Sequence, residues 1–106
     1  MTPAEAEWLL AECRRKIDAL DAQLRDLLNQ RAEIVRDVVR AKEQLSLPVY
    51  EPKREEDVVR RAITGNQGPL GDDALRHIFE TIMREMRQIQ EVYLEAQAAK
   101  RQGTAE

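Results

Sequence analysis

Apolar residues recur in alternating steps of three and four along the first half of the chain, as on one face of a long helix. The run from residue 4 to residue 47 contains no glycine and no proline, and Thr2-Pro3-Ala4-Glu5 opens it as a capping box. The pattern predicts a long helix that ends where Ser46-Leu47-Pro48 interrupts it. Its apolar row is Leu10, Cys13, Ile17, Leu20, Leu24, Leu27, Ile34, Val38, Ala41 and Leu45.

One position in this heptad row carries a charge. Arg31 stands between Leu27 and Ile34, where the repeat calls for an apolar residue. A helix of this length spans roughly 65 Å at about 1.5 Å per residue. A compact globule of about this chain length has a radius of gyration of only ~13 Å. The first helix is therefore too long for its own domain, and the row predicts a partner chain and a buried polar site.

The remaining chain predicts two more helices. After a short extended link, a second helix begins at Pro52 and ends before Gly65, which suits a left-handed cap. A third opens near Asp72, and the residues from about 100 to 106 are expected to be frayed. The prediction is a single all-α domain over residues 1–106, with helices in the order long, short, long. Two such chains would pair their first helices antiparallel. The apolar row of the third helix is Leu75, Phe79, Ile82, Met86, Ile89, Tyr93 and Ala96.

Composition narrows the class of partner. The chain is 42% hydrophobic, 35% charged and only 4% aromatic, which favours a helical bundle over a β-sandwich. Its net charge of −3 argues against nucleic acid, although residues 14–42 hold eight basic and five acidic residues. Small acidic ligands fit that local excess. The N-terminus does not resemble a signal peptide and no apolar run is long enough for a membrane span, so a cytoplasmic protein is expected.

Several polar groups could carry chemistry. Arg31 and Lys42 lie eleven residues apart, about three turns plus 20°, and could converge on a small dianion. Alternatively, Arg31 only sets the helix register and Lys42 extends along the surface into solvent. Gln90, beside the third apolar row, is a neutral donor that can be buried without the cost of burying a charge.

The start of the second helix holds a charged cluster, Glu51-Pro52-Lys53-Arg54-Glu55. Glu51 could cap the helix through its side chain, and Glu55 would face the same way one turn later. The cluster could equally be an ordinary solvated first turn. Cys13, on the apolar row, is expected to be a buried and inert thiol. His77 is the only imidazole and has no companions at ligand spacing, so no metal and no cofactor are predicted.

Taken together, these residues resemble the all-helical, AroQ-type chorismate mutase family. The opening segment resembles the family signature Arg-x-x-Ile-Asp-x-Leu-Asp, and the next resembles its Leu-Leu-x-x-Arg step. The resemblance covers about residues 10 to 93. The matching segments are Arg14-Arg15-Lys16-Ile17-Asp18-Ala19-Leu20-Asp21, Leu27-Leu28-Asn29-Gln30-Arg31, Ala41-Lys42, Pro48-Val49-Tyr50-Glu51-Pro52-Lys53-Arg54-Glu55 and Gln90.

This resemblance implies an entwined homodimer that rearranges chorismate to prephenate in phenylalanine and tyrosine biosynthesis, without a covalent intermediate. Each site would use both chains, with Arg14 supplied by the partner. Lys42 and Gln90 would donate to the ether oxygen, and Arg14 and Arg31 would clamp the two carboxylates. Glu55, helped by the backbone at Glu51, would accept from the ring hydroxyl. The implied substrate-binding set is Arg14, Arg31, Lys42, Glu51, Arg54, Glu55 and Gln90.

Helix geometry agrees with a site built from two chains. Arg14 and Arg31 are seventeen residues apart, roughly 25 Å along one helix and about 100° around it. One chain cannot easily bring both to a small ligand, whereas an antiparallel partner helix can.

Two positions depart from the family pattern, and two rival functions stay open. Glu51 stands where aspartate is commoner, and Met86 where a small polar residue often lies near a carboxylate. The rivals are an isochorismate pyruvate lyase-like enzyme and an inert helical dimerisation or regulatory module. The Glu51-x-x-Arg54-Glu55 cluster favours the mutase, because Glu55 would accept from the ring hydroxyl. The sequence leaves open whether the chain works alone or belongs to a fusion enzyme.

Overall fold

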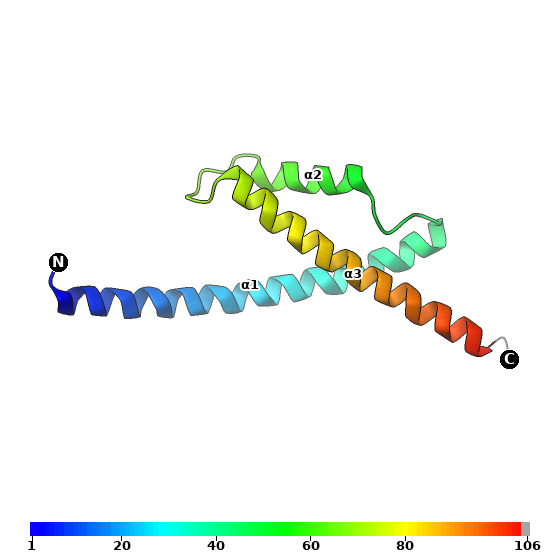
Figure 1. The fold of residues 1–106 in the computed structure, drawn as a ribbon, viewed down its shortest axis with the longest axis horizontal. Coiled ribbons are helices and arrows are strands. Elements are labelled where there is room, and N and C mark those ends of the chain that lie inside the picture. Colours follow the sequence, from blue (N-terminus) through cyan, green and yellow to red (C-terminus); the bar gives the residue numbers. More distant parts are fainter. Residues whose placement is uncertain (105–106) are drawn as a thin grey trace. The chain divides into compact units, whose positions relative to one another are not determined.

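The computed structural model describes residues 1–104, and three helices account for its regular structure (Figure 1). Helix α1 spans Pro3–Leu45, α2 spans Pro52–Ile63 and α3 spans Asp72–Thr104. The predicted all-α class, with helices in the order long, short, long, is confirmed. Within the described residues, no helix is both long enough and apolar enough to cross a membrane.

The chain divides into two compact units, residues 1–33 (unit 1) and residues 34–106 (unit 2). Unit 1 contains the first part of α1, whose predicted N-terminal cap is present: the Glu5 amide donates to Thr2 Oγ1 at 3.1 Å. Cys13 is exposed in the single chain, so its predicted burial is wrong there. The rest of the apolar row in this unit is exposed as well: Leu10, Ile17, Leu20, Leu24 and Leu27.

Unit 2 has a small apolar core to which all three helices contribute. The core residues are Val35 and Val39 of α1, Val59 of α2, and Met83 and Met86 of α3. Helices α2 and α3 pack against each other as a hairpin (Figure 1). Val59 of α2 is buried in this packing, and Val58, Ala62 and Ile63 are half-buried.

The predicted apolar row is not the row that α1 buries within unit 2. Ile34, Val38 and Leu45 are exposed, whereas Val35 and Val39 are buried. Each buried valine follows a residue of the predicted row by one position. Successive residues lie about 100° apart around a helix, so the buried row is rotated by about 100° from the predicted row. Apolar residues therefore cover two neighbouring faces of α1, one of which stays uncovered in the single chain.

Helix α1 ends at Leu45, directly before the Ser46-Leu47-Pro48 segment predicted to interrupt it, and a Schellman motif around Ser46 fixes this end. Ser46 adopts a left-handed φ of 56°, its amide donates to Glu43 O at 3.3 Å, and the Leu47 amide donates to Lys42 O at 2.8 Å. This cap reverses the chain and fixes the backbone of Lys42 in the last helical turn.

The other helix ends follow local sequence signals. Gly65 has a φ of 75°, which confirms the left-handed residue predicted after α2. Helix α3 continues through Thr104, and the fraying expected from about residue 100 stays a prediction. Residues 105 and 106 lie outside the described part.

Arg76 of α3 donates to both carboxylate oxygens of Glu56 of α2, each at 3.0 Å, and so links the two helices.

Candidate functional site

The buried ammonium of Lys42 is the centre of the candidate site. Lys42 is only 9% exposed, and its Nζ donates to Val49 O at 2.7 Å and to Gln90 Oε1 at 3.0 Å. Glu51 Oε1 lies 3.1 Å from the same nitrogen. The alternative interpretation, in which Lys42 extends along the surface into solvent, is therefore wrong. These contacts join the end of α1, the link to α2 and the middle of α3.

The contact with Lys42 sets the orientation of the Gln90 amide. Gln90 is 6% exposed and lies on α3. An ammonium group has donors and no acceptor, so Gln90 must turn its oxygen toward Lys42 and its NH₂ group away. This arrangement leaves the Gln90 NH₂ group available to donate to a ligand beside Lys42.

The link between α1 and α2 brings Glu51 to Lys42. Glu51 is the N-cap residue of α2, but its side chain makes no capping hydrogen bond, so the predicted side-chain cap is wrong. The carboxylate pairs with Lys42 instead, and the Glu51 carbonyl accepts from the Glu55 amide at 3.0 Å. The Lys42 ammonium is a stronger partner for the Glu51 carboxylate than a backbone amide of α2, because both groups of an ion pair carry a charge.

Glu55 has a partner that sequence reasoning missed. The half-buried guanidinium of Arg87 donates from Nη1 to Glu55 Oε1. The same guanidinium lies over the Tyr50 ring, with its central carbon 5.0 Å from the ring centroid. The hydrogen bond to Glu55 is the main cause that raises the pKa of Arg87. Helical spacing could have drawn attention to Arg87, which lies three positions before Gln90 on the same face of α3.

The other predicted cations are Arg54 in unit 2 and Arg14 and Arg31 in unit 1. Arg54 is exposed and pairs with Asp57, Nη1 to Oδ2 at 3.2 Å, so the structure does not join it to Lys42. Arg14 is exposed and Arg31 half-buried, both on the part of α1 in unit 1. Their roles stay predictions.

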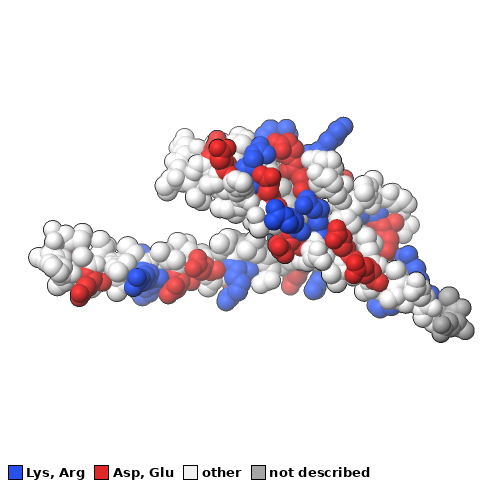
Figure 2. Space-filling model, viewed as in Figure 1, with Lys and Arg blue, Asp and Glu red and all other residues white. Residues whose placement is uncertain are grey.

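The surface of α2 and α3 carries charges of both signs. Figure 2 shows lysine and arginine interspersed with aspartate and glutamate over these helices on the face in view. Such mixing gives no extended basic surface for a polyanion on this face. Among the described residues, no group of three or more His, Cys, Asp or Glu side chains is placed to hold a metal ion.

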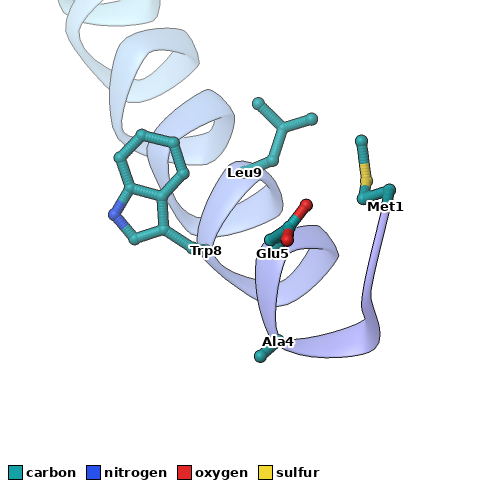
Figure 3. Close-up of a pocket in the computed structure, with 5 residues that line it drawn as sticks. All are labelled: Met1, Ala4, Glu5, Trp8 and Leu9. Atoms are coloured by element: carbon teal, nitrogen blue, oxygen red, sulfur yellow. The ribbon is translucent and has the colours of Figure 1, made fainter.

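A hollow of about 480 Å³ lies beside the first turns of α1, far along the chain from Lys42. Met1, Ala4, Glu5, Trp8 and Leu9 border it (Figure 3). Trp8 is 66% exposed, and the only charged side chain among the five is a carboxylate. None of these five side chains is cationic, so the Lys42 cluster is the better candidate for an acidic ligand.

Comparison with known proteins identifies similar sequences. The family described as "Chorismate mutase type II" matches residues 13–91. The chain is 30% identical over 89 residues to a chorismate mutase of Methanocaldococcus jannaschii, covering 81% of this chain and 88% of that protein. It is 37% identical over 79 residues to a bifunctional chorismate mutase/prephenate dehydratase of Pseudomonas aeruginosa, covering 70% of this chain and 22% of that protein. The chain thus spans about a fifth of the length of the bifunctional relatives it matches.

Solved structures give the same result. The crystal structure of chorismate mutase from Helicobacter pylori in complex with prephenate has a TM-score of 0.76 and 33% sequence identity to this chain. The match covers 82% of this chain and 94% of that one.

Proposed function

The chain belongs to the type II chorismate mutase family, and from this premise we propose that it catalyses the rearrangement of chorismate to prephenate. The observation that carries the proposal is the buried pair of Lys42 and Gln90, in which Lys42 Nζ donates to Gln90 Oε1 at 3.0 Å. This rearrangement is pericyclic, so it needs no nucleophile, no proton relay and no metal. Catalysis comes from holding the reactive conformer and from stabilising the charge that develops as the ether C–O bond breaks.

Lys42 and Gln90 act on the ether oxygen, which gains negative charge in the transition state. Both side chains are fixed by their contacts before the substrate binds, so their donors need little reorganisation during the reaction. The Glu51 side chain is 36% exposed, whereas Gln90 is only 6% exposed, so the Glu51 contact is the one that a ligand oxygen replaces. The carboxylate of Glu55 accepts from the ring hydroxyl, helped by the backbone at Glu51.

The two carboxylates of chorismate bind arginines through charge-assisted hydrogen bonds. In this proposal Arg31 and Arg54 come from the same chain as Lys42, and Arg14 comes from a second copy in a homodimer. The exposed apolar row on α1 supports that dimer, because Ile17, Leu20, Leu24 and Leu27 would leave water against the second copy. Residues 1–106 then act as one domain, whether alone or within a fusion enzyme.

The direct test is to incubate the purified protein with chorismate and to follow the loss of its ultraviolet absorbance. We expect prephenate as the product, without added metal and with no effect of a chelator, because the reaction is pericyclic. Release of pyruvate would instead support the isochorismate pyruvate lyase-like alternative. An inactive protein at high concentration would support an inert helical module.

Replacing Gln90 with glutamate should make the activity depend on acid pH. A glutamate can donate to the ether oxygen only when it is protonated, whereas the amide donates at any pH. The Lys42 ammonium 3.0 Å from the Gln90 oxygen would favour the ionised form of such a glutamate. We therefore expect kcat/KM of Gln90→Glu to rise as the pH falls from about 8 to about 5.

The matched control is Gln88→Glu, which adds the same charge two positions away, at an exposed site on α3. It should keep the pH profile of the wild type. A flat profile for Gln90→Glu over this pH range would remove Gln90 from the proposed site.

A further inference from the structure

A second pair of charged residues lies one helical turn from the Lys42 site, on both α2 and α3. Arg87 precedes Gln90 by three positions on α3, and Glu55 follows Glu51 by four positions on α2. Residues at these spacings share one face of a helix. Because Arg87 donates to Glu55, this second pair extends the contacts that join α2 and α3 at the site.

Arg87 is held from two sides. The Glu55 carboxylate accepts from its Nη1, and the Tyr50 ring lies under the guanidinium at 5.0 Å, within the range of a cation–π contact. Glu55 and Arg87 are both largely withdrawn from solvent, with side chains 20% and 26% exposed. Because the Tyr50 ring holds the Arg87 guanidinium in place, the hydrogen bond from Arg87 fixes the direction of the Glu55 carboxylate.

A carboxylate can serve two donors at once. It has two oxygens with about four lone-pair sites, and the contact with Arg87 is made through Oε1. The carboxylate therefore keeps capacity to accept from a hydroxyl. Charge matters as well, because chorismate is a dianion and the Glu55 carboxylate would repel it. A cation paired with Glu55 offsets that repulsion.

We propose that Arg87 is a positioning residue of this enzyme, which orients Glu55 toward the ring hydroxyl of chorismate and balances its charge. This inference rests on the proposed function, in which Glu55 accepts from that hydroxyl. Tyr50 contributes by holding the guanidinium plane. The pKa of Arg87 is raised by its hydrogen bond to Glu55, so Arg87 keeps its charge throughout the working pH range.

The test compares kcat and KM of Arg87→Gln, Arg87→Lys, Glu55→Gln and the double variant Arg87→Gln/Glu55→Gln. We expect Arg87→Gln to lose on the order of tenfold in kcat/KM, mainly through KM, the size of one hydrogen bond to a charged group. Arg87→Lys should regain part of the loss, since it keeps the charge without the planar fork. In the double variant, Arg87→Gln should add no further loss to that of Glu55→Gln, because Arg87 acts through Glu55.

Arg76→Gln is the matched control. Arg76 also lies on α3 and also pairs with a glutamate of α2, but that pair is exposed. Its replacement should leave kcat/KM unchanged. If Arg76→Gln lost as much kcat/KM as Arg87→Gln, the effect of Arg87 would be explained by helix packing alone, and the inference would be overturned. Circular dichroism on every variant confirms the helical fold.

Additive losses in the double variant, or a wild-type KM for Arg87→Gln, would contradict the role of Arg87. If Arg87→Gln does not fold, Arg87→Lys decides the question: its loss, expected at about threefold, must disappear in the Glu55→Gln background. The mutase activity and the role of Arg87 are contradicted by different results. A wild-type protein that leaves chorismate unchanged overturns the proposed function, whereas an active wild type with additive losses overturns only the inference about Arg87.

Discussion

Replacing Lys42 with alanine is expected to lower kcat by about 10²–10³-fold, the loss seen when one donor to a developing oxyanion is removed. Lys42 supplies a full positive charge at a site that is 9% exposed, where water cannot substitute for it. The helical fold should survive, because the Schellman motif at the end of α1 uses the backbone carbonyl of Lys42. The free energy of unfolding should fall by about 1–3 kcal/mol, since the oxygens of Gln90 and Val49 lose a buried donor.

The matched control for this experiment is Arg40→Ala. Arg40 is an exposed cation on the same helix, two positions away, paired with Asp37 at 3.3 Å. Its loss should leave kcat within about twofold of the wild type, since exposed ion pairs contribute little. Steady-state kinetics with chorismate and circular dichroism separate catalysis from folding. A loss below tenfold in a folded Lys42→Ala protein would mean that Lys42 is not the donor to the ether oxygen.

The sequence predicted the helices well because their limits depend on local signals. Pro52 begins α2 as predicted, and Gly65 takes the left-handed conformation expected after that helix. Helix α1 ends at Leu45, directly before the Ser46-Leu47-Pro48 segment that was predicted to interrupt it, but the positive φ of Ser46 was not predicted. A serine carries no strong signal for that conformation, in contrast to a glycine.

The candidate site was predictable only in part. Lys42 and Gln90 are 48 positions apart, so periodicity alone could not pair them, and the family resemblance named both. The pairing of Arg87 with Glu55 was missed, because a helical repeat shows which residues share a face but not which helix that face meets. The burial of Val35 in place of Ile34 was missed for the same reason.

The second prediction concerns a site shared between two copies of the chain. Arg14→Ala and Lys42→Ala homodimers should each be nearly inactive, because every site lacks one essential cation. In a mixed dimer one site takes Lys42 from the first variant and Arg14 from the second, and is intact. The other site carries both lesions. Random pairing after joint refolding gives half mixed dimers, so about a quarter of wild-type activity should return, as two-fold symmetry requires.

A second mixture provides the matched control. Lys42 and Gln90 belong to the same chain in the proposed site, so co-refolded Lys42→Ala and Gln90→Ala variants cannot restore an intact site in any dimer. Activity in this mixture should stay at the level of the separate homodimers. The comparison removes any general effect of refolding or of subunit mixing.

The central claim is that each catalytic site is built from two copies of this chain. Its most direct test is the rate of chorismate loss after Arg14→Ala and Lys42→Ala are unfolded together in equal amounts and refolded. The account predicts about a quarter of the wild-type rate. If Arg14 instead served the site of its own chain, every site would lack one cation, and the rate would stay at that of the homodimers. That result would contradict the shared site.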